Sequence, residues 1–257
     1  MTGIISYGAY IPYWRLQRST IASALGSNGA KGTRAVASFD EDTTSMGVEA
    51  SRIALRGVSE TYSPQSLWFA TTEPGYLDKT NANAIHAALS LDNSVNAFDC
   101  LGSVRSGIAA IHAAACGNSI AVLSDIRTGL PGGNDESLGG DGAASFCFGS
   151  ENVIAELLST GTSTSEFVDR WRTPGEKASK QWEERFGEYA YAPLVEVAFN
   201  EALKNANLTA ADVSHSIFSG LHTRAVKAAP KSCGIKLDTL RDDFAATLGN
   251  SGTAHWG

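Results

Sequence analysis

The sequence is poor in charge, and the charge it carries is not basic. Only 18% of its 257 residues are charged, and 20 Lys and Arg stand against 27 Asp and Glu, which gives a formal net charge of −7. Proteins that bind a nucleic acid backbone need the opposite balance, so nucleic acid is not an expected partner. The 43% of hydrophobic residues instead indicates a globular chain with a sizeable core.

Cysteine is also scarce. The chain has four cysteines, which are far apart and form no Cys-x-x-Cys pair: Cys100, Cys116, Cys147 and Cys233. Neither a disulfide framework nor a zinc site is therefore expected.

No uninterrupted hydrophobic run is long enough to cross a membrane. The most apolar stretch, residues 107–123, is broken by His112, Gly117 and Asn118, and the N-terminus lacks a basic segment ahead of an apolar one. We therefore expect a cytoplasmic protein that does not bind membranes.

Apolar runs alternate with helical patterns along the first half. Predicted strands cover residues 3–7, 66–70, 94–98 and 119–123, and predicted helices cover residues 43–55, 81–89 and 102–115. This alternation predicts an α/β fold in which helices cover both faces of a parallel sheet. Active sites of such folds lie at the carboxyl ends of the strands.

The rest of the chain divides into three parts. Two runs, 143–148 and 152–158, are predicted to form an antiparallel hairpin that closes a first lobe, residues 1–158. Residues 159–190 are rich in Thr, Ser, Trp and charge, and we interpret them as an excursion that covers a site. Residues 191–257 form a partial second lobe that repeats the first, with a helix at 191–206 and a strand at 216–219.

Four polar residues support this repeat. Glu73 precedes Cys100 by nearly the same number of residues as His222 precedes Asn250, and each pair places one side chain after a strand and the other at the start of a later helix. Two similar lobes would bring all four to one interface.

These residue types suit acyl transfer. Cys100 comes where a strand gives way to a predicted helix, whose dipole and free N–H groups stabilise a thiolate nucleophile. Glu73, in a turn after a strand, suits a general base, and His222 can donate to a thioester carbonyl. Asn250 lies in LGNSGTAH, where Gly252 allows the backbone to approach a ligand closely.

The motifs together resemble the thiolase-like superfamily and, within it, the 3-hydroxy-3-methylglutaryl-CoA synthase family. GIISYGAYIPYWRL is similar to that family's first strand and turn, TTEPG to its general-base segment, NAFDCLGSVRSGIAA to its nucleophile segment, GGDGAASFCFG to its closing hairpin and GNSGTAHWG to its second-lobe helix entry. The resemblance implies two similar βαβαβ lobes in an αβαβα layered arrangement. Because the family continues with a helix and two strands, it also implies that the second lobe is incomplete in this chain.

The resemblance also implies a reaction. Cys100 would be the acylated nucleophile, Glu73 the general acid/base and His222 the residue that binds the ketone of acetoacetyl-CoA, while Asn250 and Gly252 would bind substrate. The substrates would be coenzyme A thioesters, and no metal or redox cofactor is implied.

Some alternatives stay open. Thr223 and Arg224 follow His222 where the family usually has Gln-Pro, so the second substrate is undetermined. Another thiolase-like activity (β-ketoacyl synthase III, degradative thiolase or retro-aldolase) and a non-catalytic CoA-binding scaffold are the competing functions.

Association with other chains is expected as well. We predict a homodimer whose first-lobe edge is the uncharged strand 119–123, because exposed sheet edges favour pairing with another chain. The resemblance to archaeal family members adds a thiolase or a small zinc-ribbon/OB-fold protein as a partner.

Overall fold

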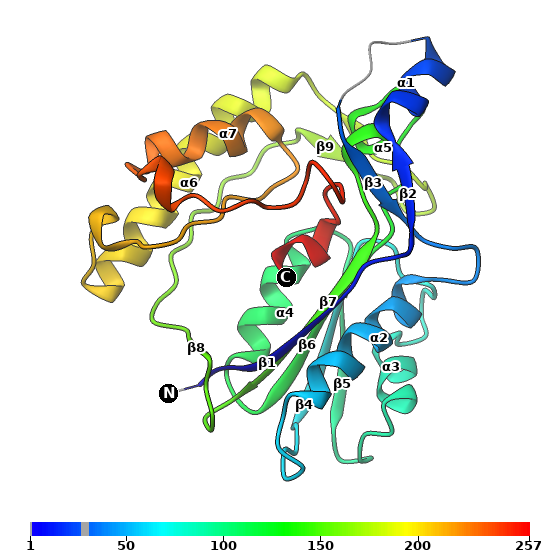
Figure 1. The fold of residues 1–257 in the computed structure, drawn as a ribbon, viewed down its shortest axis with the longest axis vertical. Helices are drawn as coiled ribbons and strands as arrows, with labels where there is room; N and C mark the ends of the chain where they lie inside the picture. The colour runs from blue at the N-terminus through cyan, green and yellow to red at the C-terminus, as the bar shows by residue number, and fades with distance from the viewer. Residues whose placement is uncertain (1, 27–30) are drawn as a thin grey trace.

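The computed structural model describes residues 2–26 and 31–257, and its centre is a six-stranded sheet (Figure 1). The strand order is β5-β4-β6-β7-β1-β8, in which β4 runs parallel to β5 and β6, and β7 runs antiparallel to β6 and β1. The strands are β1 (Gly3–Tyr10), β4 (Ser66–Thr71), β5 (Asn96–Leu101), β6 (Ser119–Asp125), β7 (Gly142–Gly149) and β8 (Ala155–Glu156). The predicted α/β class is confirmed.

Helices cover both faces of this sheet. On one face α2 (Thr43–Arg56) and α3 (Ala82–Ala88) pack on Phe69 and Val122, and on the other face α4 (Ser106–Ala114) packs on Ala70 and Leu123 (Figure 1). Because successive strand residues point to opposite faces, one apolar run supplies both layers of the core.

The start of α2 follows from local sequence. Asp42 is its N-cap: Ser45 N donates to Asp42 Oδ1 at 2.6 Å, and Asp42 N donates to Ser45 Oγ at 2.9 Å. This reciprocal pair is a capping box, which satisfies two backbone donors that the helix leaves free. It fixes Thr43 in the first turn of α2, where the Thr43 hydroxyl donates to the carbonyl of Glu73.

Strand β6 is not a sheet edge. All seven of its residues are buried between β4 and β7, so the predicted dimer edge at residues 119–123 is wrong. The uncharged run that suggested an edge is typical of a strand with neighbours on both sides and helices on both faces. At this end of the sheet the edge strand is β5.

The predicted hairpin is also wrong. β7 pairs with β6 and β1, and the short β8 pairs with β1, so β1 lies between the two strands that were expected to be neighbours. The eight residues of β1 offer a much longer ladder to β7 than the two residues of β8 can.

The second half of the chain is mainly helical. Helix α6 (Glu184–Ala206) contains the predicted helix 191–206 and lies beside α7 (Thr223–Ser232), and a short 3₁₀ helix, η3 (Gly252–Trp256), packs on α4 (Figure 1). The predicted strand 216–219 is reduced to one bridge, Ser216 to Leu240, in which Ser216 N donates to Thr239 O and Arg241 N donates to Ser216 O. The division of the chain at residues 158 and 190 stays a prediction.

Several short elements complete the fold. They are β2 (Trp14–Gln17), α1 (Arg18–Leu25), β3 (Thr33–Val36), α5 (Asn134–Leu138), β9 (Arg170–Trp171), β10 (Lys180–Gln181), η1 (Ala210–Asp212) and η2 (Leu237–Thr239). Within the described ranges, none of the helices combines the length and the apolar character that a membrane crossing requires.

Candidate active site

Three parallel strands end at the same edge of the sheet. Glu73 follows β4, Cys100 is the penultimate residue of β5, and Asp125 is the last residue of β6. Because the register aligns Ala70 with both Cys100 and Leu123, the three strand ends lie side by side. This is the edge at which open α/β sheets bind their ligands.

The backbone of Glu73 is held on both sides. Its N–H donates to Thr71 Oγ1 at 3.0 Å, and its carbonyl accepts from Thr43 Oγ1 at 2.9 Å. Its carboxylate is ion-paired to two cations of the excursion: Arg172 Nη1 lies 2.9 Å from Oε2, and Lys177 Nζ lies 3.1 Å from Oε1. The segment predicted to cover a site therefore contacts the candidate base directly.

Cys100 lies within β5 rather than at a helix start. Helix α4 begins only at Ser106, after a turn in which Gly102 has a φ of 107°, so the prediction that Cys100 starts the helix is wrong. Burial, and after it the charge of Asp99, raises the pKa of the Cys100 thiol. Because a turn separates Cys100 from α4 and the dipole effect is confined to the first turn of a helix, we do not expect this dipole to stabilise a thiolate at Cys100.

The side chains of Asp99 and Cys100 point to opposite faces of the sheet. Asp99 caps α3 by accepting from Asn81 N at 2.8 Å and from Ala82 N at 2.7 Å. Cys100 packs instead with Ala110 of α4 and Ala254 of η3. Asp99, which caps α3, thus also anchors β5, the strand that carries Cys100.

His222 is the N-cap of α7. Its Nδ1 accepts from Ala225 N at 3.1 Å, and its ring lies 6.0 Å from that of Tyr191, centroid to centroid. It packs against Gly187 of α6, where a Cβ would overlap the imidazole. His222 therefore faces α6 and lines a cavity of about 280 Å³ together with Arg170 and Tyr191.

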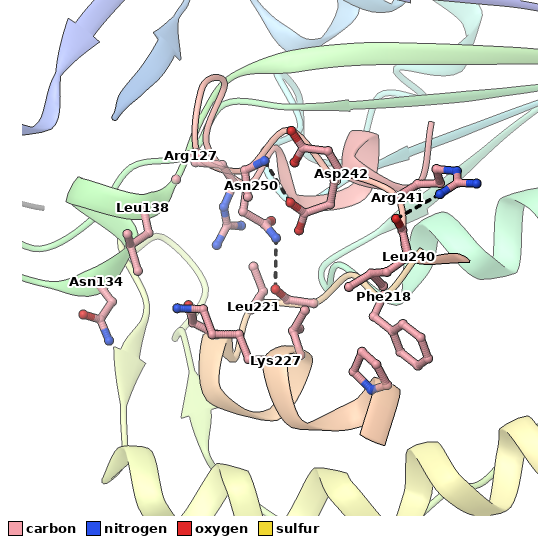
Figure 2. A pocket seen from close by; sticks show the side chains of 18 of the residues that line it. Arg127, Asn134, Leu138, Phe218, Leu221, Lys227, Leu240, Arg241, Asp242 and Asn250 are labelled. Atoms are coloured by element: carbon pink, nitrogen blue, oxygen red, sulfur yellow. Dashed lines mark hydrogen bonds between the residues drawn. The ribbon is translucent and has the colours of Figure 1, made fainter. Parts of the chain in front are cut away.

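Asn250 joins the two halves of the chain. Its Nδ2 donates to Gly220 O at 3.0 Å (Figure 2), and its Oδ1 accepts from Gly252 N at 3.0 Å. Gly252 has a φ of 61°, and a Cβ at this position would collide with the carboxylate of Asp125. Asn250 lines a cavity of about 700 Å³, the one drawn in Figure 2.

Three adjoining cavities meet at Leu221, which lines all of them. The third cavity, of about 580 Å³, is lined by Glu73, by Leu101, Gly102 and Ser103, and by the excursion. The structure thus brings Glu73 together with the residues that directly follow Cys100. His222 and Asn250 line the two neighbouring cavities, and their roles stay predictions.

A buried carboxylate that sequence reasoning missed ties this region together. Asp125 Oδ1 accepts from Thr72 N at 2.6 Å and from the hydroxyls of Thr71 and Thr72 at 3.0 Å each, and Oδ2 accepts from Thr253 N at 2.7 Å. Burial is the main influence on the pKa of Asp125 and raises it, against the charge of Arg127 and these hydrogen bonds. A signal was present, because Asp125 follows an apolar run after one serine, much as Glu73 follows one after two threonines.

A second missed group is a buried ionic network, of which Arg127, Asp135 and Arg170 help to line the cavities. Arg127 Nη2 lies 3.5 Å from Asp135 Oδ2, which also pairs with Arg170, and Arg34 Nη2 lies 3.4 Å from Asp141 Oδ1. The pairs of Asp135 join α5 to β9, and the pair of Arg34 joins β3 to the residue before β7. Over residues 2–26 and 31–257, no cluster of three or more His, Cys, Asp or Glu is arranged to hold a metal ion.

Comparison with known proteins adds homology to this geometry. No protein-family model matches the chain. Hydroxymethylglutaryl-CoA synthase of Pyrococcus horikoshii is 28% identical over 97% of this chain and 75% of its own length, and that of Caldivirga maquilingensis is 29% identical over 96% and 75%. The chain is homologous to the hydroxymethylglutaryl-CoA synthases.

Solved structures show the fold. The structure of HMG-CoA synthase complexed with CoA matches with a TM-score of 0.84 at 15% identity, over 99% of this chain and 72% of its own. MvaS in complex with 3-hydroxy-3-methylglutaryl coenzyme A gives 0.84 at 16% identity, over 99% and 74%, and 3-oxoacyl-(acyl carrier protein) synthase III of Pseudomonas aeruginosa PAO1 gives 0.84 at 15%, over 99% and 87%. The predicted thiolase-like fold is confirmed, and the homology supports the predicted acyl-CoA condensing enzyme.

Proposed function

We propose that the protein joins the acetyl group of acetyl-CoA to the ketone carbon of a 3-oxoacyl-CoA through an acyl-Cys100 intermediate. One observation carries the proposal: Glu73 and the residues that follow Cys100 line the same cavity at the carboxyl ends of parallel strands. A carboxylate and a thiol at one edge of the sheet are the two groups that acyl transfer followed by enolate formation requires.

The steps follow from these groups. The sulfur of Cys100 displaces CoA from acetyl-CoA, and its proton leaves with the CoA thiol. Glu73 takes a proton from the methyl carbon of the acetyl group, and the resulting enolate attacks the ketone carbon of the second thioester. Glu73 gives this proton to the new alkoxide, and water then cleaves the bond to Cys100, which releases the product and restores the thiol. The transfers use only thioesters, water and side chains, so we propose that no cofactor is needed.

His222 and Asn250 complete this assignment. We assign the ketone of the second substrate to His222, because its cavity adjoins that of Glu73 at Leu221. The 700 Å³ cavity beside Asn250 has the size of a pocket for an extended ligand, and Phe218 and Leu240 give it an apolar wall for the arm of a CoA thioester (Figure 2). Lys227 and Arg241, which also line this cavity, suit its phosphates.

A second candidate is condensation of the β-ketoacyl synthase III type. The fold favours neither function, since the structure of that enzyme matches as closely as HMG-CoA synthase does. Glu73 favours the first candidate, because its carboxylate lines the cavity in which an enolate would form. A non-catalytic scaffold would bind CoA without forming an acyl-enzyme.

Intact-mass measurement after incubation with a panel of acyl-CoAs tests the proposal. We expect one acetyl adduct with acetyl-CoA, mapped by digestion to Cys100, and a new six-carbon thioester when acetoacetyl-CoA is added. An adduct on the exposed Cys116 or no adduct would contradict the proposal. Chain elongation of a malonyl carrier protein would support the second candidate.

The homodimer is proposed with β5 as its edge. Within residues 2–26 and 31–257, β5 pairs with β4 alone, and Phe98 and Leu101 are 41% and 39% exposed. An uncovered edge strand of this kind is a template for pairing with a second copy. Sedimentation at micromolar concentration should give a dimer, and a stable, monodisperse monomer would refute it. The thiolase and zinc-ribbon/OB-fold partners stay predictions from resemblance.

A further inference from the structure

A hairpin of the excursion covers Glu73. Strands β9 and β10 pair antiparallel, with Trp171 opposite Lys180, and residues 171–177 form one wall of the cavity that contains Glu73. The hairpin is tied down at its base, because Arg170 pairs with Asp135 and Tyr191 Oη donates to Asp169 Oδ2 at 2.8 Å. The loop between the strands therefore has a fixed position over the candidate base.

Arg172 makes a two-point contact at the first position of this loop. Its Nη1 donates to Glu73 Oε2 at 2.9 Å, and its Nη2 donates to the backbone carbonyl of Thr72. Nη1 also lies 3.4 Å from the carbonyl of Lys177, across the loop. One rigid guanidinium thus joins the carboxylate of Glu73 to the backbone immediately before it.

The backbone of Glu73 is fixed without Arg172, whereas its side chain is not. Hydrogen bonds with Thr71 and Thr43 hold the main chain on either side. Among the described residues, the carboxylate pairs only with these two cations, and the Lys177 side chain is 80% exposed while that of Arg172 is 22% exposed. Exposed ion pairs contribute little, so orientation of the carboxylate depends on Arg172.

We propose that Arg172 is a positioning residue for Glu73, which it holds in the orientation for taking the proton from the acyl group on Cys100. The inference rests on the proposed function and adds a residue to it. The hydrogen bonds and ion pair that Arg172 makes within the described residues go to Thr72, Glu73 and Lys177, and none goes to Cys100 or the residues that follow it. We therefore expect acylation to be independent of Arg172, and enolate formation and condensation to depend on it.

The test uses three variants of the full chain. For Arg172→Ala we expect acetylation of Cys100 within about twofold of wild type, and a fall of about 10- to 100-fold in kcat for exchange of the acetyl protons with D₂O and for condensation. Arg172→Lys keeps one cationic donor, so its kcat for exchange and condensation should lie between those of wild type and Arg172→Ala. Added guanidinium chloride at low millimolar concentration should restore part of the exchange to Arg172→Ala.

Lys180→Ala is the matched control, because Lys180 lies on the same hairpin and pairs with Glu176 rather than with Glu73. This substitution should leave all rates within about twofold of wild type.

Two results would overturn the inference. One is exchange and condensation at wild-type rates in Arg172→Ala. The other is an equal loss of acetylation and exchange that neither lysine nor guanidinium restores, since that pattern belongs to a residue needed only for the fold. Failure of the wild-type protein to form acetyl-Cys100 is a different result: it removes the proposed function, and the role of Arg172 with it.

Discussion

Cys100→Ala should abolish acetyl incorporation, whereas Glu73→Ala should still incorporate acetyl and fail to condense it. Thioester exchange needs the sulfur atom, and carbon-carbon bond formation needs a base that takes the methyl proton. We expect acetylation of Glu73→Ala within a few-fold of wild type and condensation reduced by about 10²- to 10⁴-fold. Intact mass measures the first step, and chromatography of the CoA products measures the second.

Cys116→Ala is the control for the first variant. Cys116 is exposed and lies just after the C-terminal end of α4, where its thiol donates to His112 O at 3.3 Å. Both steps should therefore proceed unchanged in this variant. Equal loss of acetylation in Cys100→Ala and Glu73→Ala would mean that Glu73 does not act as the base. Glu73→Gln keeps the shape of the side chain and separates loss of the charge from loss of packing.

The strands of the central sheet in the first half, and the helices α2, α3 and α4 between them, could be predicted because each has a local sequence pattern, whereas the short β2, α1 and β3 were missed. The apolar run of β6 fits a strand with neighbours on both sides, and the acidic residues before α2 supply its cap, Asp42. Such patterns report on burial and on helix ends within a few residues. They do not report which strand lies next to which.

Strand order depends on contacts between distant parts of the chain, and there the predictions failed. β1 inserts between β7 and β8, with Gly3 opposite both Gly149 and Glu156. Nothing in the alternation of residues 142–158 indicates that a strand from the other end of the chain lies between them. For the same reason, the sequence led us to place β6 at an edge of the sheet, whereas the edge strand is β5.

The residues of the candidate site likewise divide into those that a local pattern could predict and those that it could not. Glu73 and Cys100 could be proposed because both lie at the ends of apolar strands, and parallel strand ends meet. Asp125 obeys the same rule and could have been found by it. Arg172 could not, since it belongs to an irregular segment far along the chain and its contact with Glu73 exists only in the folded protein.

Removal of Asp125 should have the largest effect on stability. Its carboxylate is completely buried and accepts from the backbone N–H groups of Thr72 and Thr253 and from the hydroxyls of Thr71 and Thr72. Asp125→Ala would leave buried donors without an acceptor, at a cost of about 3–5 kcal/mol in the free energy of unfolding. That is a large part of the about 5–15 kcal/mol that stabilises a typical domain.

Urea denaturation of Asp125→Ala and Asp125→Asn measures this cost, with the exposed Asp40→Ala as the control, for which about 0.5 kcal/mol or less is expected. Asparagine keeps the shape and one acceptor oxygen, so its cost should lie between those of the other two variants and give a measurable value even where alanine prevents folding.

The same carboxylate joins the turn before Glu73 to the turn at Gly252 and Thr253, which packs through Ala254 against Cys100. Asp125→Asn should therefore slow acetylation and condensation together, in contrast to Glu73→Ala, which separates them. Stability of Asp125→Asn and Asp125→Ala equal to that of Asp40→Ala would contradict this account of the strand ends.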